Sequence, residues 1–289
     1  MGERLGVALG ILSCCCGAGA AVATRFLVVD GDPITIAAIR FAGGALCLLP
    51  FALAARVRWP ARADWPAVAT LGLSFYAVFF ILYNLALTYT TVARGTLALS
   101  TLPLMTMATA ALLGREALSV RKTTGVLVAM GGVAFALSSG LAAAPAGAWR
   151  GDLLMAAATL CMAVYSIWSR PFVGRSSPLG FLTAGMSVGG AALVVASVIA
   201  GGGARIGGFG ATQWLASAYL ALGGGALAFL LWVYALEHAS PTRVTNTMTV
   251  NPLVAGFGAA LLLGEPFTPV LAAGLVAVFA GIWIATTGV

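Results

Sequence analysis

The chain has 289 residues, of which 61% are hydrophobic and only 8% are charged, and its net charge is +7. A soluble domain carries about a quarter charged residues, so this composition excludes a water-soluble protein. The positive charge does not indicate nucleic-acid binding, because the basic residues lie in short gaps between long apolar runs, where they signal membrane orientation.

Ten long apolar runs follow one another along the chain. A membrane-spanning helix needs about 20 predominantly apolar residues. The runs cover residues 5–24, 33–54, 65–87, 92–113, 120–138, 151–172, 178–200, 212–236, 241–263 and 268–287. The segments between them are short and polar or glycine-rich, so no domain is expected outside the membrane. The sequence therefore predicts an all-α integral membrane protein with ten transmembrane helices.

The basic residues divide unevenly between alternate gaps. With a cytoplasmic N-terminus, the cytoplasmic side carries Arg4, Arg56, Arg58, Arg62, Arg115, Arg121, Lys122, Arg170, Arg175 and Arg243. The opposite side carries only Arg25, Arg94, Arg150 and Arg205. Lys and Arg accumulate in cytoplasmic loops, so both termini are predicted to be cytoplasmic.

The sequence contains an internal repeat. A shift of 149 residues places Trp65 on Trp214, Arg94 on Arg243, Pro103 on Pro252, Glu116 on Glu265, Gly125 on Gly274 and Gly132 on Gly281. This offset predicts two five-helix halves, residues 1–138 and 151–289, joined by a linker at 139–150. Because five is odd, the second half is inverted, an arrangement common in secondary transporters. The alternative is that the duplication reflects the assembly history of a channel, receptor or scaffold.

Two short stretches at equivalent repeat positions carry a family resemblance. Residues 112–119 (LLGREALS) resemble the EamA-type signature of the drug/metabolite transporter superfamily, and residues 263–268 (LGEPFT) form a second copy. The glycines that follow are Gly125, Gly131 and Gly132 in the first copy and Gly274 and Gly281 in the second. The chain is most similar to bacterial aromatic and neutral amino-acid exporters. The resemblance implies a multi-pass carrier of the bacterial inner membrane that exports or exchanges small metabolites.

Two prolines lie near the middle of predicted spans. Pro103 and Pro252 occupy equivalent repeat positions in the fourth and ninth spans. A proline inside a helix frees a backbone carbonyl, so both spans are predicted to kink near the midplane of the membrane. Ser100 lies close to the first proline. Its hydroxyl either hydrogen-bonds to its own helix or faces a polar cavity.

Aromatic, amide and hydroxyl side chains inside the spans are the candidates for substrate binding. They are Tyr76, Phe79, Tyr83, Asn84, Ser100, Tyr165, Trp168, Trp232, Asn246 and Asn251. A mostly apolar pocket with a few polar groups suits aromatic or aliphatic amino acids. The alternative is structural: tryptophan and tyrosine anchor span ends at the interface, and amides hydrogen-bond between helices.

Charged residues within or beside the spans are further candidates. Arg40 lies inside the second span, where it either contacts a substrate carboxylate or extends toward the interface. We expect Arg94 to pair with Glu265, and Arg243 with Glu116, as two symmetry-related ion pairs that act as gates. The alternative is that each glutamate caps the helix that follows it.

The chemistry that the chain lacks narrows its function. His238 is the single histidine, and we expect no metal, cofactor or catalytic residue, which leaves an intramembrane enzyme as a minor alternative. All acidic residues fall at span ends or in loops, whereas a proton carrier needs a carboxylate near the midplane. The sequence thus favours transport by alternating access, with a small-molecule substrate and the lipid bilayer as partners, over a proton-coupled multidrug or other metabolite antiporter. Its oligomeric state is not predicted.

Overall fold

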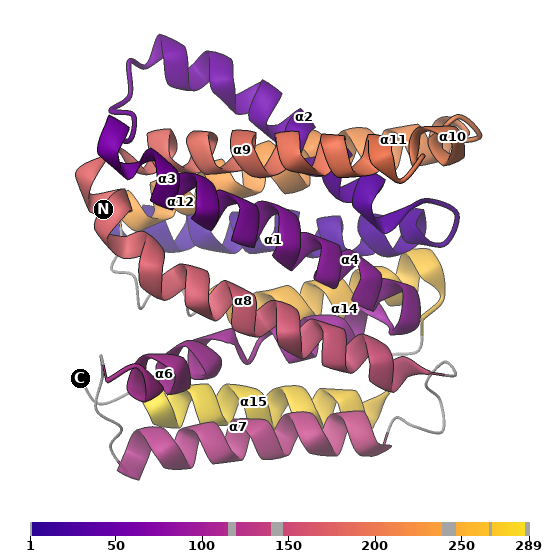
Figure 1. The fold of residues 1–289 in the computed structure, drawn as a ribbon. Helices are drawn as coiled ribbons and strands as arrows, with labels where there is room; N and C mark the ends of the chain where they lie inside the picture. Colours follow the sequence, from indigo (N-terminus) through magenta and orange to yellow (C-terminus); the bar gives the residue numbers. More distant parts are fainter. Residues whose placement is uncertain (1, 115–119, 140–146, 239–246, 266–267, 287–289) are drawn as a thin grey trace.

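The computed structural model describes residues 2–114, 120–139, 147–238, 247–265 and 268–286 (Figure 1). Helices make up the regular structure of these ranges, and no strand occurs in them. The three predicted residues Glu116, Arg243 and Asn246 lie outside the described residues, as does most of the predicted linker.

The first half of the chain forms the predicted first five spans. Its elements are α1 (Gly2–Val28), α2 (Pro33–Ala54), a 3-10 turn η1 (Arg62–Asp64), α3 (Trp65–Gly72), a π-helical segment η2 (Leu73–Phe79), α4 (Phe80–Tyr89), α5 (Val92–Leu99), α6 (Leu102–Leu112) and α7 (Val120–Ser139). The third span is thus one long helix from α3 to α4 with a π-helical middle.

The second half follows the same order. Its elements are α8 (Ala148–Arg175), α9 (Pro178–Ile199), α10 (Gly203–Ile206), α11 (Ala211–Tyr219), a π-helical segment η3 (Leu220–Leu227), α12 (Ala228–His238), a 3-10 turn η4 (Thr247–Thr249), α14 (Val250–Leu263) and α15 (Pro269–Thr286). The eighth span, from α11 to α12, is again a long helix with a π-helical middle.

Local sequence explains where the helices begin. α2 follows the N-cap Asp32, whose carboxylate accepts a hydrogen bond of 2.8 Å from the amide of Thr35. α9 starts in the same way, with Ser177 accepting 3.0 Å from the amide of Gly180. Each cap is followed by a proline, which has no N–H to leave unpaired in the first turn.

The described helices agree with a multi-pass membrane protein. Six of them are long and apolar enough to cross a membrane: Arg4–Val28, Pro33–Ala54, Arg62–Tyr89, Ala148–Arg175, Pro178–Ile199 and Ala211–Ala235. Shorter apolar helices occur at Thr123–Gly132, Val250–Leu263 and Ala272–Gly281. They fall within predicted spans five, nine and ten.

The fourth span is broken close to Pro103, where a kink is predicted. α5 and α6 meet at an angle of 40°. The break lies just before Pro103, which sits in the first turn of α6, because proline supplies no N–H and crowds the preceding turn. In the ninth span Pro252 lies in the first turn of α14, directly after the 3-10 turn η4.

Helices from the two halves pack against one another throughout the molecule. α7 and α15 lie side by side along one edge (Figure 1), where Gly132 and Gly281 allow close contact with the partner helix. α2 packs on α9, α1 on α12 and α14, and α8 on α4 and α6. Small residues at helix contacts are typical of membrane bundles, because they let backbones approach closely.

Candidate functional site

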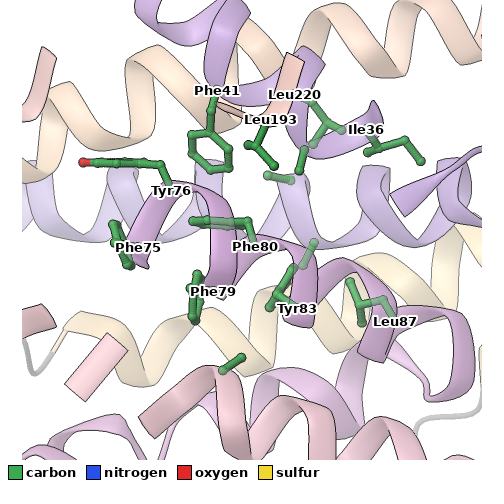
Figure 2. Packing of buried hydrophobic residues seen from close by; sticks show 14 of the residues in the cluster. Ile36, Phe41, Phe75, Tyr76, Phe79, Phe80, Tyr83, Leu87, Leu193 and Leu220 are labelled. Carbon is green, nitrogen blue, oxygen red and sulfur yellow. The ribbon is translucent and has the colours of Figure 1, made fainter. Parts of the chain in front are cut away.

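Aromatic side chains of the third span form the centre of the core. Figure 2 shows Phe75, Phe79, Phe80 and Tyr83 along one helix, with Phe41 of α2 facing them. The ring centroids of Phe41 and Phe80 lie 4.2 Å apart, in contact range for aromatic pairs. The row therefore packs on itself and on α2.

The structure brings together four of the predicted substrate-binding residues. Tyr76, Phe79 and Tyr83 are buried, and Tyr165 of α8 joins them. The Tyr165 ring stacks on Phe75 with centroids 4.3 Å apart. The cluster lies where α2, the third span, α8 and the eighth span meet. Phe80 of the same span belongs to it as well, and so do Phe75, Phe41 and Phe229, which were not among the predicted residues.

Tyr76 packs directly against two glycines of the neighbouring helix α9. A Cβ atom on Gly189 would lie 2.5 Å from the Cβ of Tyr76, and one on Gly185 would lie 3.2 Å from its ring. Tyr76 is 1% exposed. Glycine at these two positions is what lets the π-helical segment η2 sit directly on α9.

Arg40 is a cation buried inside the helix bundle. The side chain emerges from α2, and the residue is 5% exposed. Its Nη2 and Nε donate to the carbonyl oxygen of Gly224 over 3.0 and 3.3 Å. Its guanidinium also lies over the rings of Phe80 and Phe41, 4.8 and 5.2 Å from their centroids. Within the described part of the chain no carboxylate pairs with it.

Arg40 consequently has more N–H donors than the described residues offer it acceptors. A guanidinium carries five N–H groups, and a single backbone carbonyl receives the two hydrogen bonds described. The aromatic faces supply partial compensation through cation–π attraction. A charged group in this environment is costly to bury, and such residues mark functional sites by default. Arg40 is therefore the strongest single candidate for substrate binding in the spans.

Two asparagine amides have a buried oxygen that receives no hydrogen bond from the described residues. Asn84 donates from Nδ2 to the carbonyl of Pro33 over 2.9 Å, but its Oδ1 receives no donor from the described residues. The Oδ1 of Asn251 is likewise buried without a donor from them. Asn251 faces Gly17 of α1, where a Cβ would lie 3.5 Å from its Nδ2.

The remaining predicted residues lie apart from this centre. Ser100 donates to the carbonyl of Leu97 in its own helix over 2.6 Å, as the structural alternative for it expects. Trp168 is 38% exposed. Trp232 packs with Leu9 and Ala235 in a separate small cluster. The two tryptophans are therefore not part of the aromatic centre.

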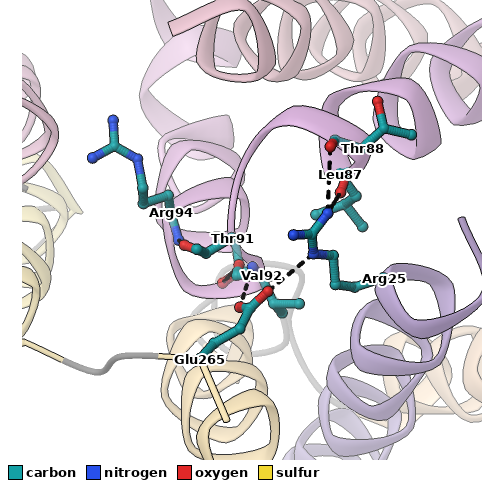
Figure 3. A network of polar contacts seen from close by, with 8 residues as sticks. Arg25, Leu87, Thr88, Thr91, Val92, Arg94 and Glu265 are labelled. Atoms are coloured by element: carbon teal, nitrogen blue, oxygen red, sulfur yellow. Dashed lines mark hydrogen bonds and ion pairs between the residues drawn. The ribbon is translucent and has the colours of Figure 1, made fainter. Parts of the chain in front are cut away.

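Glu265 joins both halves of the chain at one end of the bundle (Figure 3). Its Oε1 lies 3.0 Å from Nε of Arg25, and its Oε2 accepts 2.8 Å from the amide of Val92. Arg25 also donates to the carbonyl of Leu87 over 2.5 Å. The Glu265 carboxylate thus lies at the amino end of α5, and the Arg25 guanidinium lies at the carboxyl end of α4. The helix dipole favours a negative charge at the first position and a positive charge at the second.

The ion pair predicted between Arg94 and Glu265 is wrong. Arg25 occupies the place assigned to Arg94, and Nη2 of Arg94 instead lies 2.6 Å from Oδ2 of Asp152 in α8. The Arg94 side chain points away from Glu265 in Figure 3, because the start of α5 presents a backbone amide to the carboxylate. The carboxylate of Glu265 thus caps the start of α5.

A third ion pair between the halves lies at the opposite end of the spans. Nη2 of Arg175 is 2.8 Å from Oδ1 of Asp64, and the amide of Ser177 donates 2.9 Å to the carbonyl of Arg58.

Near Glu265, a surface hollow of about 250 Å³ is lined by Arg25, Phe26, Val29, Asp30, Leu263 and Glu265. No group of three potential metal ligands occurs among the residues that the structure describes.

Known proteins resemble this chain along nearly its whole length. The EamA-like transporter family matches it twice, over residues 4–138 and 149–287. An uncharacterized protein of Pseudomonas aeruginosa is 30% identical over 286 residues, which are 98% of this chain and 94% of the relative. A probable terminal-alkyne amino-acid exporter of Streptantibioticus cattleyicolor is 26% identical over 232 residues, 79% of this chain and 75% of the relative. One solved crystal structure, 18% identical, shares the fold with a TM-score of 0.68 and covers 97% of this chain and 96% of its own.

Proposed function

Because the chain belongs to the EamA-like transporter family, we propose that it exports amino acids, aromatic and neutral ones among them, by alternating access around a central cavity. The chain is a multi-pass membrane transporter of small solutes and not an enzyme. The name of the exporter from Streptantibioticus cattleyicolor supports the substrate class. Both relatives are bacterial, which supports a place in the bacterial inner membrane.

The observation that carries the proposal is the buried guanidinium of Arg40. A carboxylate is the natural partner of a guanidinium, since the two form parallel hydrogen bonds as well as an ion pair. In our proposal the substrate carboxylate supplies the negative charge that the surrounding helices lack. The positive charge of Arg40 disfavours cationic drugs as substrates, which argues against a multidrug antiporter.

The other predicted residues complete the proposed site. The unused amide oxygens of Asn251 and Asn84 are acceptors for a substrate ammonium group. Tyr76, Phe79, Tyr83 and Tyr165 form a wall for an apolar side chain when the two halves separate. In the conformation described here these rings pack on one another.

Two features support the proposed inverted repeat. Packing contacts occur in pairs that exchange the halves: α1 on α12 corresponds to α8 on α4, and α2 on η3 corresponds to α9 on η2. The third and eighth spans also both contain a π-helical middle. Two similar halves that pack in this way can exchange the roles of inner and outer gate.

Transport measurements with a matched pair of solutes test the proposal. Labelled L-phenylalanine and phenethylamine share a ring and an amine but differ in the carboxylate. In proteoliposomes the protein should carry the first and not the second. Arg40→Gln should lower L-phenylalanine transport by about tenfold or more, because a charge-assisted contact is lost. Arg62→Gln, at an exposed arginine outside the ion pairs described, is the control. Transport of phenethylamine or a quaternary ammonium dye, without L-phenylalanine transport, would overturn the proposal.

A further inference from the structure

The π-helical segment η3 leaves a backbone carbonyl without a partner in its own helix. At its end the amide of Ala228 bonds to the carbonyl of Gly223, five residues earlier. The α-helix that follows uses bonds to the fourth residue back. When a helix changes from the first pattern to the second, one carbonyl is skipped, and here that carbonyl belongs to Gly224.

Arg40 satisfies this carbonyl. Both of its described hydrogen bonds end on the Gly224 oxygen, at 3.0 and 3.3 Å. An unpaired carbonyl in the apolar part of a membrane is costly. The guanidinium therefore stabilises the π-helical form of the eighth span, and the π-helical form provides the acceptor described for the guanidinium.

Three consecutive glycines make the contact possible. A Cβ on Gly224 would clash with the Cβ of Ala20 in α1, and a Cβ on Gly225 would lie 2.5 Å from the carbonyl oxygen of Arg40 in α2. The segment thus packs closely between α1 and α2, and its glycines place no side chain on either side. No side chain of its own shields the Gly224 carbonyl from Arg40.

We propose that Arg40 couples substrate binding to the shape of the eighth span: a substrate carboxylate displaces the Gly224 carbonyl, and η3 then converts from π-helical to α-helical bonding. After conversion the amide of Ala228 bonds to Gly224 instead of Gly223, so the released carbonyl is satisfied within the helix. This inference rests on the proposed function, because it takes the substrate carboxylate as the competitor.

The conversion turns α11 relative to α12, since the two helices are joined by η3. Tyr219 is the last residue of α11, and its hydroxyl donates 3.1 Å to the carbonyl of Cys16 in α1. A turn of α11 breaks this bond and moves the second half against α1. Substrate binding at Arg40 is in this way converted into movement between the halves.

The segment η2 provides an internal control in the same molecule. It occupies the corresponding place in the third span, but its neighbours are the rings of the aromatic core. Its Ser74 carbonyl is contacted by the Cys161 thiol at 3.2 Å, and no arginine among the described residues bonds to it. The proposal therefore expects η3 to respond to the substrate and η2 to stay unchanged.

Amide hydrogen exchange of the full-length protein in nanodiscs tests the coupling. Because α-helical bonding protects these amides better, Arg40→Gln without any ligand should slow exchange in residues 224–230 by about tenfold and leave residues 73–80 unchanged. Saturating L-phenylalanine should have the same effect on the wild type and none on the variant. Wild-type exchange at 224–230 in the variant would overturn the proposal.

A second variant keeps Arg40 in place. Gly224→Ala with Ala20→Gly relieves the clash and favours the α-helical form, because alanine is the better helix former. It should also slow exchange at 224–230, and unchanged exchange there would count against the coupling. If L-phenylalanine transport depends on Arg40 while neither variant alters exchange, the coupling is wrong and the proposed function stands. If both variants slow exchange but L-phenylalanine is not carried, the contact between Arg40 and the π segment stands and the proposed substrate is wrong.

Discussion

The two ends of the spans are both joined by ion pairs between the halves, but the pairs differ in their exposure. At the Glu265 end, defined by Arg25, Arg94, Asp152 and Glu265, the Arg94 and Asp152 side chains are 7% and 14% exposed. At the Asp64 end, defined by Asp64 and Arg175, the Arg175 side chain is 56% exposed. Sheltered charges interact strongly and are costly to separate, whereas exposed charges are screened by water.

The ion pairs at the two ends therefore hold the halves together unequally in this conformation. Opening the Glu265 end leaves charges and helix ends in need of new partners, but opening the Asp64 end exposes groups that already contact water. We therefore propose that this conformation is closed more firmly at the Glu265 end. Substitutions at the two ends measure this difference directly.

The largest effect is expected from Asp152→Asn. The substitution removes the negative charge 2.6 Å from Arg94 and leaves a sheltered cation without it. Breaking a buried pair in this way costs about 3 kcal/mol of stability. Unfolding with increasing sodium dodecyl sulfate in mixed micelles measures the loss. The double variant Arg94→Met, Asp152→Leu should recover most of it, because no uncompensated charge remains. A single variant as stable as the wild type would contradict the comparison.

An intermediate effect is expected at Glu265. Glu265→Gln removes the charge beside Arg25 but keeps an oxygen that accepts from the Val92 amide. Glu265→Ala removes both interactions. The alanine variant should lose about 1 kcal/mol more than the glutamine variant, the usual contribution of a helix cap. The same unfolding measurement separates the two terms. Equal losses in both variants would show that the cap contributes nothing.

The smallest effect is expected from Asp64→Asn. Its partner Arg175 is more than half exposed, and exposed pairs contribute about 0–1 kcal/mol. The loss should fall further at high salt, because salt screens exposed charges. The free energy of unfolding of Asp152→Asn and of Asp64→Asn, measured at increasing sodium chloride concentration, compares the two ion pairs. A larger loss for Asp64→Asn than for Asp152→Asn would reverse the assignment of the firmly closed end.

Much of the fold was predictable because a membrane requires a simple pattern of its spans. Apolar runs such as residues 33–54 and 178–200 coincide closely with α2 and α9, since each must cover the hydrocarbon thickness. The break before Pro103 follows from the missing N–H of proline. The π-helical segments were not predictable, because their residues are as apolar as those of an ordinary helix and only the packing of neighbours selects the wider turn.

The candidate site was predicted in part. Arg40 was identifiable because a charge inside a span is rare, and Tyr76, Phe79 and Tyr83 were identifiable by their spacing on one helix. The partner of Glu265 was not, because repeat symmetry pointed to Arg94 while the direction of its side chain led it to Asp152. A useful signal was the position of Arg25 in the last turn of its helix, where an arginine can reach a neighbouring helix end.

The sequence by itself determined a helical membrane protein, the positions of most of its spans, the repeat offset and the isolated charge of Arg40. These properties depend on local composition and on the thickness of the bilayer, which act on each segment separately. Only the tertiary structure decided that Arg25 meets Glu265, that Arg94 meets Asp152 and that Arg40 meets the carbonyl of Gly224. Those contacts depend on side-chain direction and helix register across segments far apart in the chain, which no local pattern encodes.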